Sequence, residues 1–232
     1  TTSRPLEPMA AGWSQQLLGV AAVAGWLALL ALAALQVRGR WNGQREWSRK
    51  LVHIGTGAVV PIAWATGIDR LIAIPAAGLI TLLAAMNHRF RLLPAIEDVG
   101  RASYGTIAYG ASITLLLLQF WPQQPAAVAA GVLVMAVGDG LAGLLGPLVS
   151  SPCWLVWGQR KSVVGTGAMA AGSLAMLLLV RQLAIAAGLP HPELPALLAI
   201  SATAVVLEQV AVGGLDNFTV PLAAGWLWQR LS

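Results

Sequence analysis

The residues best suited to chemistry in this sequence are three acids placed among apolar residues and glycines. Asp139 lies within VLVMAVGDGLAGLLG (132–146), Glu208 lies near the end of another apolar run, and Asp216 follows soon after it. Carboxylate oxygens are ligands for hard cations such as Mg²⁺, and Lys and Arg side chains bind the phosphates that accompany such ions. Carboxylates beside basic residues at a membrane surface would therefore suit phosphoryl chemistry.

A basic cluster stands earlier in the chain. Arg49, Lys50 and His53 are spaced so that they would share one face of a helix. His53 is a candidate base, because histidine changes charge near neutral pH. The alternative is that His53 only packs, since a lone histidine in a membrane helix is more often a hydrogen-bonded packing residue.

The acids and the glycines near Asp139 also have a packing interpretation. A carboxylate at a helix end can be an interfacial residue that pairs with a neighbouring Arg. Gly138, Gly140, Gly143 and Gly146 can let two helices approach closely. The same glycines would leave the backbone free to approach a phosphate. Packing and function are compatible at this motif.

Two common nucleotide-binding motifs of soluble proteins are excluded. The hexamer GDGLAG (138–143) fits GxGxxG, but it ends an apolar run instead of following a strand, so we reject a Rossmann fold. The P-loop pattern GxxxxGK[ST] does not occur, because Lys161 and Ser162 follow GQR.

The composition indicates a membrane protein. Only 10% of the 232 residues are charged, 57% are hydrophobic, and the mean hydropathy is +0.73. One cysteine, Cys153, excludes an intramolecular disulfide and a CxxC zinc cluster. A bound metal would therefore depend on oxygen ligands.

The apolar runs between charges and Pro/Gly clusters predict an all-α fold. A membrane helix needs roughly 20 apolar residues, and WPQQP (121–125) breaks a run that is too long for one helix. We expect a single domain over residues 1–232, a polytopic bundle of seven or eight transmembrane helices. The expected helices cover 17–36, 51–68, 71–87, 102–120, 126–138, 162–180 and 194–214, and the short stretch 217–229 is either an eighth, tilted helix or a re-entrant segment.

The loop charges predict the orientation of this bundle. Ten basic residues fall in the linkers 38–50, 88–101 and 147–161, on one side, and four fall on the other. The positive-inside rule places the ten in the cytoplasm and the N-terminus outside. Asp139, Glu208 and Asp216 would then lie at the cytoplasmic end. Nucleic acid is excluded as a partner, because the sequence has no basic soluble face with interleaved aromatic residues.

Five ordered segments resemble the polyprenol kinases, which include dolichol kinase, phytol kinase and the CTP-dependent diacylglycerol kinase of yeast type. The likeness covers about residues 49–225, preceded by a first transmembrane helix and a basic linker in 1–48. It implies a membrane enzyme that transfers the terminal phosphate of a nucleoside triphosphate, usually CTP, to a lipid alcohol. The segments are RKLVHIGTG (49–57), EDVGRASYGTIAYG (97–110), VGDGLAGLLG (137–146), GQRKSVVGTGAMA (158–170) and LDNFTVPLAAG (215–225).

The resemblance also implies roles for single residues. Asp139, between Gly138 and Gly140, matches the acid of the family's nucleotide-binding stretch, and Asp216 with Asn217 matches an acidic element near the end. Arg49, Lys50 and His53 match an early basic motif. The second basic motif is matched by Arg101, Ser103, Tyr104 and Gly105, and the phosphate-contacting loop by Arg160, Lys161, Ser162, Gly165 and Thr166.

One departure bears on the substrate. Dolichol kinases resemble KKTxEGT in the phosphate-contacting loop, whereas this chain has RKSVVGT with Val164 in place of the Glu. The phytol kinase branch also lacks that Glu. The resemblance therefore favours phytol, or a related alcohol such as geranylgeraniol or farnesol, over dolichol. It also gives Asp216 or Glu208 a larger role in binding metal.

Phosphoryl transfer depends mostly on positioning and charge neutralisation. We expect Mg²⁺ on Asp139, shared with Asp216 or Glu208, and the phosphates on Lys161, Arg160 and Arg101. Asp139, Lys161 and His53 are the candidate catalytic residues, and the base is either His53 or a carboxylate.

Other functions remain as alternatives. Within the family they are a diacylglycerol or dolichol kinase. A phosphatidate cytidylyltransferase would share CTP and a lipid substrate, but its C-terminal signature is absent. A small ion-coupled transporter would need charges near the midplane and an internal repeat, and the sequence shows neither. The choice between a monomer and a homodimer is left open.

Overall fold

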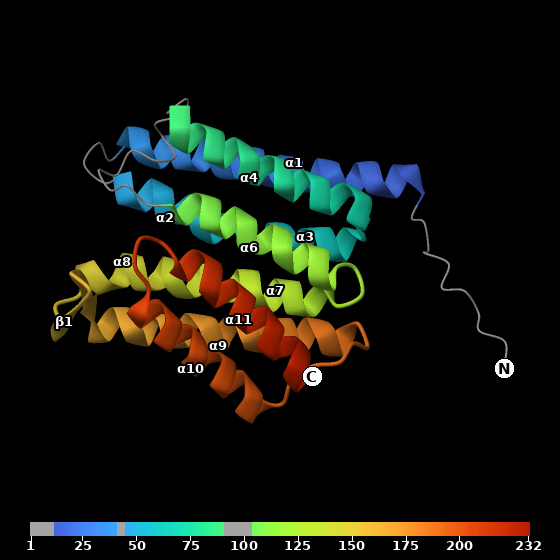
Figure 1. The fold of residues 1–232 in the computed structure, drawn as a ribbon. Coiled ribbons are helices and arrows are strands. Elements are labelled where there is room, and N and C mark those ends of the chain that lie inside the picture. Colours follow the sequence, from blue (N-terminus) through green and yellow to red (C-terminus); the bar gives the residue numbers. More distant parts are fainter. Residues whose placement is uncertain (1–11, 41–44, 91–103) are drawn as a thin grey trace.

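The structure is a computed structural model that describes residues 12–40, 45–90 and 104–232. The described residues form an all-α bundle with one short β-hairpin (Figure 1), so the predicted fold class is confirmed. Before the hairpin, the helices are α1 (Trp13–Arg40), α2 (Arg45–Thr56), α3 (Val59–Thr66), α4 (Arg70–Phe90), α6 (Gly105–Phe120), α7 (Pro125–Leu133), the π-helix η1 (Val134–Asp139) and α8 (Gly140–Leu148). The hairpin is β1 (Cys153–Val156) and β2 (Gln159–Ser162), followed by α9 (Val163–Ala186), α10 (Leu194–Val210) and α11 (Asp216–Leu231).

Four helical segments in the described part of the chain are long and apolar enough to cross a membrane. They are α1, α4, the continuous run Pro125–Leu148 and α9. The apolar helices α6 and α10 are shorter, at 16 and 17 residues. The number of spans, seven or eight, therefore stays a prediction, while the multi-helix membrane bundle itself is established.

The predicted helix 51–68 is wrong in one respect, because the structure divides it into α2 and α3. The break falls at Gly57 and Ala58. A Cβ on Gly57 would lie 2.5 Å from the Cβ of Ala136 in η1. The chain therefore bends where it approaches another helix too closely for a side chain.

The predicted end of the fifth span at residue 138 is also wrong. Helices α7, η1 and α8 form one run of 24 residues that ends at Leu148. Asp139 thus lies nine residues inside the run, about 13 Å from its end at 1.5 Å per residue. A charged residue can lie inside a membrane helix when another residue of the bundle neutralises it, and Lys50 neutralises Asp139.

The hairpin between α8 and α9 was not predicted from the sequence. Its strands pair antiparallel, with Leu155 opposite Arg160 and Trp154 opposite Lys161. The turn places Trp157 at φ 50° and Gly158 at φ 77°. Positive φ at both central residues is typical of the two-residue turns that suit the twist of a hairpin.

Helix α7 is the centre of the bundle. All nine residues of PAAVAAGVL are buried, as expected for a helix that is apolar on every side. It packs against α6, α9 and α11. Glycines allow the close contacts: a Cβ on Gly131 would overlap the carbonyl of Pro221, and one on Gly225 would lie 2.6 Å from Leu116 Cδ2.

The ends of the helices agree with the predicted grouping of the basic linkers. Figure 1 shows that α1, α4, α8 and α10 end, and α2, α6, α9 and α11 begin, at the same end of the bundle, on the left of the view. The hairpin lies at this end too. We call it the linker end; its placement in the cytoplasm stays a prediction.

Replacing Gly131 by Ala tests the packing of α7 on α11. The new Cβ meets backbone, which cannot move aside cheaply, so we expect a loss of about 1–3 kcal/mol of unfolding free energy. Thermal unfolding in detergent measures it. Gly78→Ala in α4 is the matched control, because its Cβ would meet nothing within 4 Å. Equal unfolding midpoints for the two variants would contradict the close contact.

Candidate active site

A buried ion pair joins α2 to the central helical run. Lys50 Nζ lies 2.6 Å from Asp139 Oδ2 and also donates to the carbonyl oxygen of Asp139, at 3.1 Å. The side chains are only 5% and 15% exposed. Breaking a buried pair by removing one partner is strongly destabilising, because the other charge then lacks compensation. The pair therefore holds α2 in place.

Glycines let α2 lie this close to the run. A Cβ on Gly140 would overlap Ile54, and one on Gly143 would overlap the Lys50 side chain. On the other side, a Cβ on Gly138 would lie 2.6 Å from Ser173 Oγ in α9. These contacts match the packing interpretation of the glycine series. A contact of Gly138 or Gly140 with phosphate stays a prediction.

The π-helix η1 supplies carbonyl groups to the site. Its wider turn shifts the backbone hydrogen bonding, and such segments occur often at functional sites. Side chains from α2 and α6 donate to carbonyls along this part of the run. The donors are Lys50 to Asp139, His53 to Met135 at 3.4 Å, and Tyr109 to Val132 at 3.4 Å.

His53 is oriented by these acceptors. Its Nε2 lies 3.3 Å from Asp139 Oδ2 and 3.4 Å from the Met135 carbonyl oxygen. Both partners accept hydrogen bonds, so Nε2 carries the proton. The ring of Tyr109 lies 4.9 Å from the His53 ring, centre to centre. In a neutral His53, Nδ1 is then the nitrogen that can accept a proton.

A second ion pair joins the hairpin to α10. Lys161 Nζ lies 2.5 Å from Glu208 Oε1 and 2.7 Å from the carbonyl oxygen of Glu208, and both side chains are 10% exposed. Gln209 Nε2 donates to Glu208 Oε2 at 2.8 Å and to Thr166 Oγ1 at 2.9 Å. The hairpin, the start of α9 and the end of α10 thus form one polar network.

Ser162 forms the N-cap of α9 within this network. Its Oγ accepts a hydrogen bond from the backbone N–H of Gly165 at 3.1 Å, the usual N-cap arrangement. Thr166 Oγ1 donates to the Ser162 carbonyl at 2.9 Å. Gly165 is buried against Gly146 of α8, with a Cβ position 3.6 Å from the Gly146 Cα.

Asp216 interacts electrostatically with one member of each ion pair, Asp139 and Lys161. Burial and the negative charge of Asp139 raise the pKa of the Asp216 carboxyl above its ordinary value, while the positive charge of Lys161 opposes the rise. Asp216 Oδ1 accepts from the side chain of Asn217 at 3.1 Å and from its backbone N–H at 2.9 Å. Two carboxylates that repel each other would both gain from a cation between them.

The other predicted site residues in the described part of the chain are more exposed or lie at the start of a helix. Arg49 forms an ion pair with Glu46, and its side chain is 42% exposed. Arg160 is exposed and lies next to Lys161 on β2, so the two side chains project from opposite faces of the hairpin. Tyr104 is exposed with its ring 4.8 Å from His88, and Gly105 begins α6. Arg101 and Ser103 lie outside the described residues.

Two residues of the site were missed in the sequence. Tyr109 lies in the segment 97–110 and is 7% exposed. A tyrosine in an apolar helix needs a polar partner when it is buried, and this requirement is the sequence signal that points to Tyr109. Gln209 stands next to Glu208 at the end of an apolar helix. Two adjacent polar residues in such a run indicate a polar network rather than a lipid-facing surface.

The described residues supply some, but not all, of the oxygen ligands that a hard cation such as Mg²⁺ needs. Among the described residues, no group of three His, Cys, Asp or Glu side chains is placed to hold a metal ion. Asp139 and Asp216 supply carboxylate oxygens. Mg²⁺ commonly uses one or two carboxylates and completes its shell with phosphate oxygens and water. The two residues therefore suit a Mg²⁺ that arrives with a nucleotide.

Comparisons with known proteins decide the family. No family model matches the chain, and no solved structure matches it. A curated phytol kinase from Synechocystis sp. is 36% identical over 219 residues, which cover 91% of this chain and 93% of the relative. The chain belongs to the polyprenol kinase family. It is a membrane kinase that phosphorylates an alcohol, as the five sequence segments predicted.

Replacing Lys50 by Met tests the buried pair in this kinase. The Asp139 carboxylate would stay buried without its cation, so we expect a loss of about 3–5 kcal/mol of unfolding free energy. Arg49→Met is the matched control one residue away, because its exposed pair is worth about 1 kcal/mol or less. Thermal unfolding in detergent measures both variants. A Lys50→Met midpoint as high as that of Arg49→Met would contradict the structural role of the pair.

Proposed function

We propose that this protein is a CTP-dependent prenol kinase that phosphorylates phytol or a related isoprenoid alcohol at the cytoplasmic face of its membrane. The observation that carries the proposal is the 36% identity, over nearly the whole chain, to a phytol kinase. Val164, in place of the glutamate of dolichol kinases, favours the same branch. CTP as donor rests on the resemblance to the family.

We assign Mg²⁺ to Asp139 and Asp216 in this proposal. Burial and, after it, the negative charge of Asp139 raise the pKa of the Asp216 carboxyl, and a shared cation would relieve the repulsion between the two acids. Bound there, Mg²⁺ would neutralise part of the charge on the phosphates of the nucleotide. Glu208 Oε1 lies 2.5 Å from Lys161 Nζ, and we give it the role of orienting that lysine.

The phosphates would contact cations that the fold already holds in place. Lys50 and Lys161 come from separate elements, and each is fixed by an acid and by that acid's carbonyl oxygen. Arg49 is exposed and within electrostatic reach of both Asp139 and Asp216. Phosphoryl transfer depends mainly on positioned charge, so cations held in this way suit the reaction.

His53 is our candidate for the base. Asp139 and Met135 fix the proton on Nε2, which leaves Nδ1 to accept the proton of the alcohol. The alcohol oxygen would bond to the terminal phosphorus as the bond from that phosphorus to the departing CDP breaks. The isoprenoid tail would stay in the bilayer between helices, with the hydroxyl at the linker end.

A substrate panel tests the proposal. The purified protein in lipid vesicles is assayed with radiolabelled CTP, ATP and UTP against phytol, geranylgeraniol, farnesol, dolichol and diacylglycerol. We expect the highest kcat/KM with CTP and phytol or another short isoprenoid alcohol. Preference for diacylglycerol or dolichol would refute the substrate, and preference for ATP would refute the donor.

Asp139→Asn tests the proposed centre. Loss of the carboxylate should lower kcat by about 100-fold or more, since it removes charge stabilisation at the reaction site. Glu193→Gln is the control, because Glu193 is 77% exposed and pairs with Arg181 far from Asp139 in the fold. The thermal unfolding midpoint of Asp139→Asn, measured beside its kcat, separates lost activity from lost stability. Full activity in Asp139→Asn would remove Asp139 from the site.

A further inference from the structure

The hairpin β1–β2 exposes large apolar side chains at the linker end. Leu155 is 74% exposed, Trp157 at the turn is 78% exposed, and Trp154 is 39% exposed. Exposed apolar groups gathered in this way mark a surface that contacts a membrane or a protein. Nothing in the proposed chemistry uses them.

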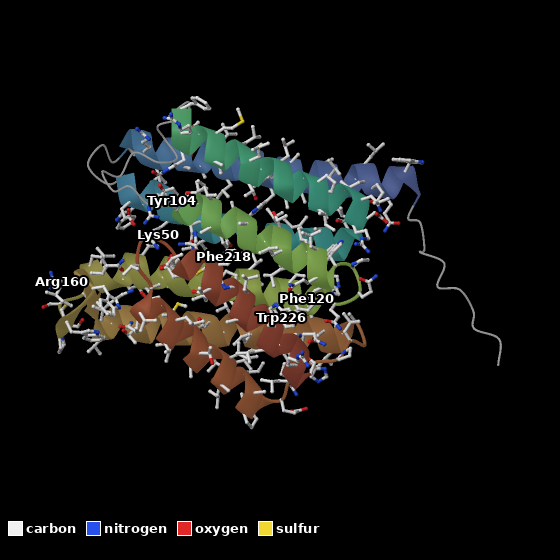
Figure 2. All side chains as sticks on the ribbon, viewed as in Figure 1. Lys50, Tyr104, Phe120, Arg160, Phe218 and Trp226 are labelled. Carbon is white, nitrogen blue, oxygen red and sulfur yellow. The ribbon has the colours of Figure 1, made fainter. Side chains whose placement is uncertain are left out.

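The two faces of the hairpin have different partners. Trp154 and Lys161 are cross-strand neighbours on one face, and Lys161 reaches Glu208. Leu155 and Arg160 are neighbours on the opposite face. Figure 2 shows Arg160 at the outer edge of the molecule, at the same end as Lys50. An apolar residue beside an outward-facing guanidinium is the pairing found where lipid tails meet headgroups.

The apolar surface of the hairpin is continuous with that of the helices on either side. Leu148 and Val149 at the end of α8 are 58% and 48% exposed, and Val163 at the start of α9 is 52% exposed. Both helices belong to segments long and apolar enough to cross a membrane. Their ends at the hairpin therefore mark the edge of the bilayer, and the hairpin extends their lipid-facing surface.

We propose that the hairpin docks into the headgroup layer of the membrane that the helices cross. Leu155 and Trp157 lie among the upper acyl chains and headgroups, where tryptophan is enriched. Arg160 binds a lipid phosphate. Docking holds β2 in place, and β2 carries Lys161 to Glu208 and Ser162 to the N-cap of α9. The inference rests on the membrane placement of the helices and is independent of the donor and the alcohol.

Cys153 provides the probe, because it is the single cysteine of the chain and is exposed on β1. The full protein is labelled at Cys153 with an environment-sensitive dye and placed in phosphatidylcholine vesicles in which about one lipid in five is anionic phosphatidylglycerol. Lipids with a nitroxide near the headgroup should quench the dye, and aqueous iodide should quench it weakly. Strong iodide quenching without lipid quenching would overturn the proposal.

Variants make the test specific. Leu155→Ser with Trp157→Ser should raise iodide quenching by about twofold and lower lipid quenching, because the apolar anchor is lost. Val212→Ser is the control, since Val212 is an exposed apolar residue of the α10–α11 loop, outside the hairpin. Equal quenching in the two proteins would overturn the role of Leu155 and Trp157. Lipid quenching needs no catalysis, so its result is distinct from failure of the proposed kinase reaction.

Arg160→Gln separates a lipid phosphate from a nucleotide phosphate. We expect that vesicles with and without phosphatidylglycerol will quench the dye equally in this variant. A severalfold rise in the KM for CTP with unchanged lipid quenching would assign Arg160 to the nucleotide and overturn its lipid role.

Discussion

The structure depends on how two charges are kept inside a membrane bundle. Lys50 and Asp139 lie 2.6 Å apart and are nearly inaccessible to solvent. Charges in an apolar interior are tolerated only when they are paired and their remaining hydrogen-bonding groups are satisfied. The fold meets these demands locally: glycines at 140 and 143 let α2 approach, and the π-helix offers the carbonyl oxygens of Met135 and Asp139 to donors from α2.

The second ion pair, Lys161 with Glu208, repeats the arrangement on other elements. In each pair the lysine Nζ contacts both the carboxylate and the backbone carbonyl of the same acid. Asp216, at the start of α11, is within electrostatic reach of Asp139 and of Lys161. The half of the bundle toward the linker end thus holds acids and cations in fixed positions before a substrate arrives. Such preorganisation is what phosphoryl transfer requires of a protein.

Much of this arrangement could be predicted from the sequence, and the failures have physical causes. Uncharged runs predicted α1, α4 and α9 closely, because hydropathy follows bilayer thickness. The sequence predicts a helix end at Asp139, because a charge normally leaves the bilayer; its partner Lys50 is 89 residues away, and sequence spacing does not show such pairs. The same holds for Lys161 and Glu208.

The hairpin is not predicted from the sequence, because four-residue strands with a Trp-Gly turn give a weak signal beside long helices. The sequence places Arg160 and Lys161 in one phosphate-contacting loop; β2 directs the two side chains to opposite faces, and their contact with phosphate stays a prediction.

We propose that the paired charges Lys50–Asp139 and Lys161–Glu208 form a binding site for a Mg²⁺-bound nucleotide. Thermal unfolding of the purified protein with CTP, with Mg²⁺ and with both measures this binding, because a ligand that binds only the folded state raises the unfolding midpoint. We expect a clear rise of the midpoint with Mg²⁺ and CTP together, a much smaller rise with either alone, and loss of the joint effect in the Asp139→Asn and Lys50→Met double variant. An unchanged midpoint with Mg²⁺ and CTP, or an equal rise with a cation alone, would contradict it.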